Sequence, residues 1–334
     1  MNWKLASSVA VAAACFASTA AAQLLLVPDW TADRVMAYSA ADGSLVNLDY
    51  IVEGGLVVFN SPKEVIQVGS ELWVTDQVSD SLTRFNLAGN MHLGTITGGM
   101  DNIRGAAFAN GRVYVANNGT GNGAPGRAIV TLDPTGAPLG SWPLVANGDP
   151  FEVFELNGEL LIVDIQNDNV DRFSYAGAYI ATLIDGGVTG LGFPQQITLR
   201  TNGNLLIAAF SVPNPGVYEY TPAGASVNYW GVSTGPRGAY ELGDGEILYT
   251  DSAGVHKFDP TSGASTLIQG GVNAQYITAI CPGDLNGDRR TDEVDLGVLL
   301  AAWLTSAAGD YTGDGATDEA DLGILLANWQ CAAR

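Results

Sequence analysis

The most restrictive feature of this sequence is a repeat with a period of about 45 residues. Each copy contains a short apolar run that ends in a small or polar residue, as in LWVTD at residues 72–76. The runs end at Asp29, Asp76, Asn117, Asp164, Ala209 and Asp251. A fixed period of this length predicts one structural unit that recurs along the chain and buries its apolar faces against its neighbours.

A second apolar segment follows each of these runs. It reads SLTRFN at residues 81–86, and the other copies occupy residues 34–39, 128–133, 169–174, 216–221 and 254–259. Most of these segments lead into turns that carry Gly or Pro, so they are expected to be strands. With a weaker segment on each side, every period holds about four strands, which is typical of one blade of a β-propeller. We therefore predict an all-β six-bladed propeller over residues 23–280, with a strand-based solenoid of the same period as the alternative.

The two ends of the repeat region predict how the ring closes. A lead segment precedes every run except the first, at residues 61–66, 102–106, 149–154, 193–198 and 235–240. The missing lead is found instead at the end of the repeats, at residues 274–278. We therefore expect this last strand to complete the blade that begins at residue 24, which would remove the free sheet edges and join the ends of the ring. The repeat pattern resembles the NHL-like and related six-bladed propellers, a resemblance that implies a fold and hardly a function.

The N-terminal 22 residues are expected to be a secretory signal peptide. Lys4 supplies a positive charge, residues 5–16 are mostly apolar, and residues 20–22 are three alanines, which fits cleavage before Gln23. The alternative is an N-terminal membrane anchor, but the apolar run is shorter than the ~20 residues that a span needs. No later segment reaches that length, so we predict a soluble protein that is secreted or held at the cell surface.

Composition excludes several classes of function. The chain has 35 acidic residues against 14 Lys and Arg, a formal charge of −21, which disfavours binding to nucleic acid or anionic lipid. It has only two His and three Cys, so a His-rich metal centre or a dense disulfide scaffold is not expected. We found no H-E-x-x-H motif that would indicate a zinc protease.

The composition changes at Cys281, where residues 281–334 form a separate C-terminal segment. Two acidic loops, residues 284–295 and 310–321, place oxygen-bearing side chains at positions 1, 3, 5, 9 and 12. Such spacing suits calcium, which prefers six to eight oxygen ligands, with a main-chain oxygen at position 7. The candidate ligands of the first loop are Asp284, Asn286, Asp288, the carbonyl of Arg290, Asp292 and Asp295. Those of the second loop are Asp310, Thr312, Asp314, the carbonyl of Ala316, Asp318 and Asp321.

Each loop leads into an L-G-x-L-L-A-x-W sequence, at residues 296–303 and 322–329, which predicts a short helix. In each helix the first, fourth, fifth and eighth residues are expected to share one apolar face. Arg289 stands at position 6 of the first loop, where Gly usually relieves a left-handed turn, and Thr312 is a neutral ligand. We therefore expect two bound calcium ions, neither held at full strength. The alternative is an acidic solvated tail without ions.

The duplicated loop–helix unit resembles a type I dockerin. The sequences CPGDLNGD and ANWQC near its two ends resemble the dockerin-like modules of secreted planctomycete-type bacterial proteins. The resemblance implies calcium-dependent docking to a cohesin-like or cell-surface protein and a link to polysaccharide breakdown. It also implies two alternative docking orientations, with contacts at loop positions 10 and 11, namely Glu293, Val294, Glu319 and Ala320.

Cys281 and Cys331 lie at the two ends of this module, and Cys15 would leave with the signal peptide. We predict a disulfide between the remaining pair, because a module of this size buries little core and a cross-link would add about 3–4 kcal/mol. Two free thiols are the alternative.

The mouth of the propeller channel is the other candidate site. Radial symmetry would gather side chains from the lead segments: Glu64, Arg104, Glu152, Gln196, Gly238 and Tyr276, with Arg237 alongside. This ring suits a polar ligand such as a glycan, or one metal ion between Glu64 and Glu152. The alternative, which we favour, is that these groups satisfy one another and trapped water.

Two functions follow from these observations. The first is a secreted non-catalytic binding or display protein, in which the propeller recognises a partner or glycan and the tail attaches it. The second is a secreted propeller enzyme, a lactonase, lyase or glycan-active hydrolase linked to polysaccharide breakdown.

Overall fold

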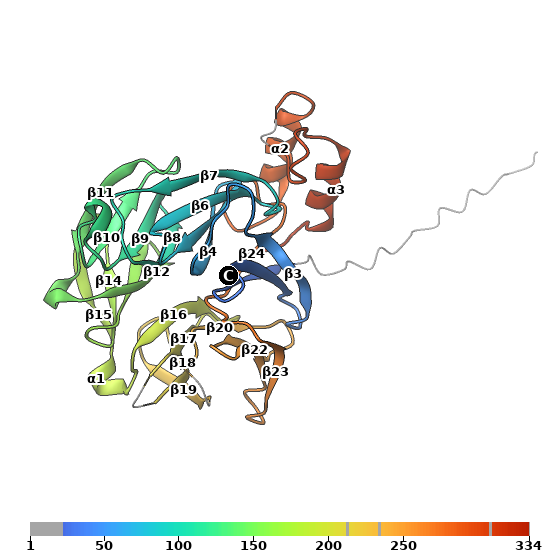
Figure 1. Ribbon diagram of the computed structural model, residues 1–334. Coiled ribbons are helices and arrows are strands. Elements are labelled where there is room, and N and C mark those ends of the chain that lie inside the picture. Colours follow the sequence, from blue (N-terminus) through green and yellow to red (C-terminus); the bar gives the residue numbers. More distant parts are fainter. Residues whose placement is uncertain (1–22, 212–213, 233–234, 307–308, 334) are drawn as a thin grey trace, which may run out of the picture.

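A computed structural model of the protein describes residues 23–211, 214–232, 235–306 and 309–333. The predicted signal peptide lies outside the described residues. The described strands form six four-stranded antiparallel sheets arranged as a ring (Figure 1). The protein is therefore a six-bladed β-propeller, as the repeat predicts, and not a solenoid. None of the helices in the described ranges is long and apolar enough to cross a membrane.

Each blade runs from an inner strand at the channel to an outer strand at the rim. Blade 1 contains β24 (Thr278–Ile280), β1 (Leu24–Asp29), β2 (Arg34–Ser39) and β3 (Leu45–Val52). Blades 2 and 3 contain β4 (Pro62–Val68), β5 (Glu71–Asp76), β6 (Ser81–Asn86) and β7 (His92–Thr97), then β8 (Ile103–Ala109), β9 (Arg112–Asn117), β10 (Ala128–Leu132) and β11 (Pro138–Pro143). Blades 4 and 5 contain β12 (Pro150–Leu156), β13 (Glu159–Asp164), β14 (Asn169–Phe173) and β15 (Tyr179–Asp185), then β16 (Pro194–Leu199), β17 (Leu205–Ala209), β18 (Gly216–Tyr220) and β19 (Ser226–Gly231). Blade 6 contains β20 (Gly238–Glu241), β21 (Ile247–Thr250), β22 (Gly254–Phe258) and β23 (Ser265–Gly270).

The polar residue that ends each apolar run explains part of the repeat. Asp76 is fully buried, and its carboxylate accepts hydrogen bonds from the main-chain N–H groups of Asn60 and Ser61. Asp164 does the same for Asp149, at 2.8 Å. Because buried N–H groups need partners, these carboxylates fix the loop that delivers the inner strand of the blade.

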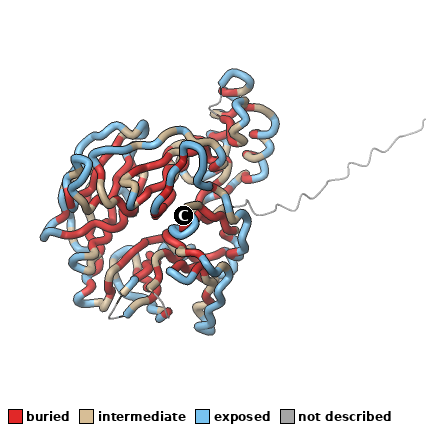
Figure 2. The backbone as a smooth tube through the Cα atoms, viewed as in Figure 1, coloured by how far each residue is buried: buried red, intermediate tan, exposed pale blue. Residues whose placement is uncertain are grey.

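The ring closes as the position of the last lead segment predicts. β24 pairs antiparallel with β1, with Leu24 opposite Ile280 and Leu26 opposite Thr278. A C-terminal strand thus supplies the inner strand of the N-terminal blade. Buried residues follow the strands next to the channel, and the rim strands are exposed (Figure 2).

A register irregularity recurs near the start of four inner strands, in β4, β8, β12 and β16. A bulge inserts one residue, so that consecutive side chains can turn toward the same side. In β4 this brings both Lys63 and Glu64 into the channel.

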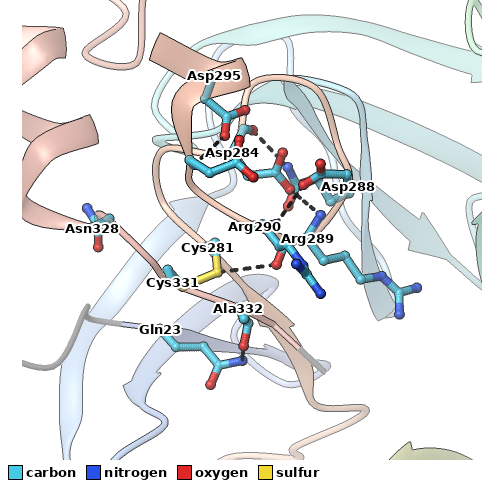
Figure 3. The surroundings of a disulfide bond; sticks show 12 residues. Gln23, Cys281, Asp284, Asp288, Arg289, Arg290, Asp295, Asn328, Cys331 and Ala332 are labelled. Atoms are coloured by element: carbon cyan, nitrogen blue, oxygen red, sulfur yellow. Dashed lines mark hydrogen bonds between the residues drawn. A yellow bond between two sulfur atoms is a disulfide. The ribbon is translucent and has the colours of Figure 1, made fainter.

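The tail contains α2 (Glu293–Ala302) and α3 (Glu319–Ala327), each beginning with a capping box. The remaining helices are the short 3-10 turns Gly121–Gly123 and Val145–Asn147 and the single-turn α1 (Gly186–Thr189). The predicted disulfide is present between Cys281 and Cys331, and both cysteines are buried (Figure 3).

The predicted apolar face of the two tail helices needs one correction. Leu299 and Leu325 are completely buried, but Leu300 and Leu326 are each 55% exposed. The buried pair joins a core cluster that also contains Phe59 of the propeller. Neighbouring leucines in a helix point about 100° apart, and the core cluster, to which both helices contribute, covers only one of each pair.

Candidate functional site

The inner strands bring most of the predicted channel ring together. Glu64, Glu152 and Gln196 line one cavity of about 70 Å³. The prediction for Arg104 is wrong by one position, because the strand register makes Gly105 the counterpart of Glu64. Arg104 instead matches Lys63.

Lys63 also lies in the channel, and it is not among the candidate site residues predicted from the sequence. Its amino group donates to Gln275 Oε1 at 3.0 Å and to Gln195 Oε1 at 3.4 Å, and so reaches across the ring to other blades. It also lies 4.9 Å and 4.6 Å from the ring centroids of Phe151 and Tyr276. Burial, and the positive charges of two nearby arginines, lower the pKa of Lys63 well below its usual value. The chain contains few lysines, so a lysine within a lead segment could have indicated this position from the sequence.

Glu64 and Glu152 form a buried carboxyl pair beside this lysine. Glu64 Oε2 accepts from the Ala106 N–H at 2.6 Å, and the two carboxyl groups are hydrogen-bonded to each other. Burial raises the pKa of Glu64 to about 8. Burial and the neighbouring charge of Glu64 raise the pKa of Glu152 well above its usual value. Both carboxyls are therefore protonated at neutral pH, because ionising either one inside the protein is costly.

The other ring members bond to the protein itself. Gln196 donates to the Ile277 carbonyl and accepts from its N–H, both at 2.9 Å. Arg104 pairs with Asp149 at 2.7 Å, and Arg237 donates to Asn273 at 2.7 Å. Gly238 packs its backbone close to Gln196, where a Cβ would come within 2.7 Å of the amide oxygen. Tyr276 donates to the main chain of blade 5.

The channel cavity is small for a ligand site. Its volume of about 70 Å³ accommodates ordered water, whereas ligand pockets usually exceed about 300 Å³. Arg289, from the first loop of the tail, also lines it. The cavity therefore has the size for trapped water; Glu152 Oε2 and Arg104 Nε are buried without a hydrogen-bond partner among the described residues, and the other ring members bond to the protein.

The two acidic loops have matching backbone hydrogen bonds. Asp284 accepts from Gly287 and Arg289, each at 2.7 Å, and Asp310 accepts from the corresponding Gly313 and Gly315 at 2.6 and 2.8 Å. At position 12, Asp295 and Asp321 each accept from the N–H groups of positions 2, 3 and 9. Positions 4 and 6 are left-handed in both loops. Asp292 and Asp318 cap α2 and α3.

The buried charge of these loops fits a cation. Asp284, Asp295 and Asp321 are completely buried and form no ion pair in the part of the chain that the structure describes. Burial, helped by the charges of Asp295 and Asp288, raises the pKa of Asp284 to about 7. No three His, Cys, Asp or Glu side chains among the described residues are grouped as a preformed metal cluster. The predicted set relies in addition on amide, hydroxyl and main-chain oxygens, a donor chemistry that suits calcium.

The predicted partner contacts lie at the solvent surface. Glu293 and Val294 begin α2, Glu319 and Ala320 begin α3, and all four are exposed.

Comparisons with known proteins add to the fold. No protein-family model and no curated protein sequence matches the chain. A propeller in the crystal structure of a nidogen/laminin complex has a TM-score of 0.58 and 14% identity over 77% of this chain and 98% of that one. A Bacteroides uniformis protein provisionally assigned as a 6-phosphogluconolactonase has a TM-score of 0.50 and 14% identity, covering 77% of this chain and 85% of that one. Virginiamycin B lyase from Staphylococcus aureus has a TM-score of 0.44 and 17% identity, covering 61% and 68%, and is too distant to support an argument. At these identities the likeness is one of fold alone.

Proposed function

We propose that this is an exported, non-catalytic binding and display protein. Its propeller recognises a partner or a glycan, and its dockerin-like tail attaches it to a cohesin-like or cell-surface protein. The observation that carries the proposal is the matched pair of loops, each buried at its carboxylates and exposed at positions 10 and 11. The disulfide supports an oxidising compartment outside the cytoplasm.

Calcium is the ion that this tail would take. The twelve oxygen donors predicted from the loop pattern would hold two ions, with Asp284 and Asp310 at position 1 and Asp295 and Asp321 at position 12. The ions would neutralise carboxylates that are now buried without a cation partner.

The proposal is tested by titrating calcium into the mature full-length protein and measuring the heat. We expect two sites. Asp288→Asn and Asp314→Asn should each weaken one site by about tenfold or more, since a charged ligand is lost while the acceptor for the local N–H is kept. Asp133→Asn, in an exposed propeller turn with similar local bonds, is the matched control. No heat in the wild type at millimolar calcium would refute the proposal.

A second candidate is a secreted propeller hydrolase or lyase. The Glu64–Glu152 pair favours it, because strongly shifted carboxyl groups often mark general acids and bases. Glu152→Gln should abolish turnover of lactones or uronic-acid polysaccharides if this candidate holds. Equal activity of variant and wild type, or no activity in either, would leave the pair as a structural element.

A further inference from the structure

The two loops of the tail contact two different hairpin turns of one propeller blade, blade 2, and the core that the tail shares with the propeller also includes residues of blade 1. The first loop lies on the turn between β4 and β5, and the second lies on the turn between β6 and β7 (Figure 1). The two similar loops of the tail therefore contact two similar hairpin turns of blade 2.

Gln67 of β4 joins the first loop to the propeller. Its amide nitrogen donates to the carbonyl of Asp284 at 3.0 Å and to the carbonyl of Gly69 at 3.1 Å. Gly287, at position 4 of the loop, lies flat against the same turn. A Cβ there would come within 2.7 Å of the Gly69 Cα, so no side chain fits.

Asn90 plays the corresponding part for the second loop. Its amide nitrogen donates to the carbonyl of Thr312 at 2.8 Å, and Asn86 donates to the carbonyl of Tyr311 at 3.4 Å. Gly313, again at position 4, has no room for a Cβ beside the amide oxygen of Asn90. Both loops therefore present the glycine at position 4 to the same blade, while the accepting carbonyl is at position 1 in the first loop and at positions 2 and 3 in the second.

Apolar contacts reinforce these hydrogen bonds. Position 2 of each loop, Leu285 or Tyr311, is buried in the core cluster that contains Phe85 and Leu87 of blade 2. The Tyr311 hydroxyl also donates to the carbonyl of Gly283, which ties the second loop to the start of the first.

Arg289 makes a third connection. It has a left-handed backbone with φ of 68°, a conformation that costs a residue with a Cβ on the order of 1 kcal/mol. Its side chain points away from the loop carboxylates (Figure 3) and lines the channel cavity with Glu64. The arginine at a glycine position is thus explained by its contact with the propeller.

We propose that blade 2 is part of the calcium-binding unit: Gln67 and Asn90 hold the two loops in their binding conformation, so calcium binding and docking of the tail on the propeller are coupled. The inference rests on the calcium binding proposed above. A free loop must order its backbone when the ion enters, and a loop already held by the blade avoids that cost. Linkage requires that calcium, in return, strengthens the contact between tail and propeller.

The test measures calcium heats on the full-length, disulfide-intact protein. Gln67→Ala should weaken one site and Asn90→Ala the other, each by about three- to tenfold, the range expected for one lost hydrogen bond. Combining each change with Asp288→Asn or Asp314→Asn identifies which loop is affected. Gln77→Ala is the matched control, since Gln77 follows β5 of the same blade and its amide bonds to Asn102, just before β8 of blade 3, and not to the tail.

Thermal unfolding with and without calcium supplies a second readout. Calcium should raise the melting temperature less in the Gln67 and Asn90 variants than in the wild type and the control. A wild type that binds calcium, with both variants binding equally well, would overturn this inference alone. A wild type that gives no heat would overturn the proposed function and the inference together.

Discussion

At the scale of single residues, the channel contains a short chain of buried titratable groups. Lys63 is held by two amides and two rings, and the carboxyl pair of Glu64 and Glu152 lies next to it. Burial disfavours the charged form of all three, so the lysine has a lowered pKa and the carboxyls have raised ones. The propeller can therefore bury these three polar side chains at its centre while burying few net charges.

The carboxyl pair should make stability depend on pH. Between the usual carboxyl pKa of 4.5 and the folded value of about 8, Glu64 is protonated in the folded state and ionised in the unfolded state. The folded state then binds more protons, so the free energy of unfolding falls as pH rises through this window, by at most about 1.4 kcal/mol per pH unit. We expect Glu64→Gln to gain stability relative to the wild type from pH 5 to pH 8.

Denaturant unfolding at several pH values measures this difference, and comparison with the variant cancels the opposite contribution of Lys63. Glu155→Gln, in the same strand as Glu152 but only half-buried, is the control. Parallel pH curves for Glu64→Gln and the wild type would contradict the assignment.

Gly105 should be intolerant of any side chain. A Cβ at this position would overlap a carboxyl oxygen of Glu152 and come within 2.9 Å of the Phe151 carbonyl oxygen, which belongs to the backbone. Gly105→Ala is expected to reduce the free energy of unfolding by about 1–3 kcal/mol. Gly105 is not left-handed, so its cost is steric; Gly111→Ala, where the added Cβ meets nothing within 4 Å but φ is left-handed at 68°, separates this steric cost from a backbone cost. Equal stability of Gly105→Ala and the wild type would show that the pair can move.

At the scale of elements, the last strand and the tail follow one another without a linker. β24 ends at Ile280, Cys281 follows it, and the disulfide returns the chain from Cys331 to the same place. Next to it, Gln23 donates to the carbonyl of Ala332 at 3.4 Å (Figure 3). The first described residue, the closing strand and the end of the tail are therefore neighbours.

Removing the disulfide should destabilise the tail. The loop that it closes spans 50 residues, for which the chain-entropy model gives about 4 kcal/mol. The Cys281→Ser, Cys331→Ser double variant is expected to unfold at lower denaturant concentration, with the tail more sensitive to protease than the propeller. Protease digestion followed by mass spectrometry locates the first cleavage sites. First cleavage in the propeller blades would contradict the expectation that the tail is the more sensitive part.

At the scale of the whole molecule, the tail is packed on the propeller and does not hang from it as a separate module. One core cluster contains residues of β1, β2, β4, β5 and β6 together with Leu285, Leu299, Tyr311 and Leu325 of the tail. A shared core predicts that tail and propeller unfold together. We expect a single calorimetric transition for the full-length protein, and two resolved transitions would show that the tail folds on its own.

Neighbouring leucines of α3 test the shared core directly. Leu325→Ala should lower the free energy of unfolding of the whole protein by about 2–5 kcal/mol, because it empties a fully buried position. Leu326→Ala, one residue further and 55% exposed, should change it by less than about 0.5 kcal/mol. If Leu325→Ala affected only a separate tail transition, the core would not be shared.

The sequence by itself determined the six blades, the closing strand, the paired cysteines and the two acidic loops. Each of these features follows from residue spacing along the chain: the strand periodicity, the missing first lead segment, and the oxygen donors at fixed loop positions. Only the tertiary structure decided which side chains meet. The bulge in the inner strands made Gly105 the counterpart of Glu64 and placed Arg104 level with Lys63, and a one-residue shift of this kind leaves no local trace in the sequence. The docking of the tail on blade 2 likewise depends on residues over 200 positions apart, such as Gln67 and Asp284, whose contact no short pattern encodes.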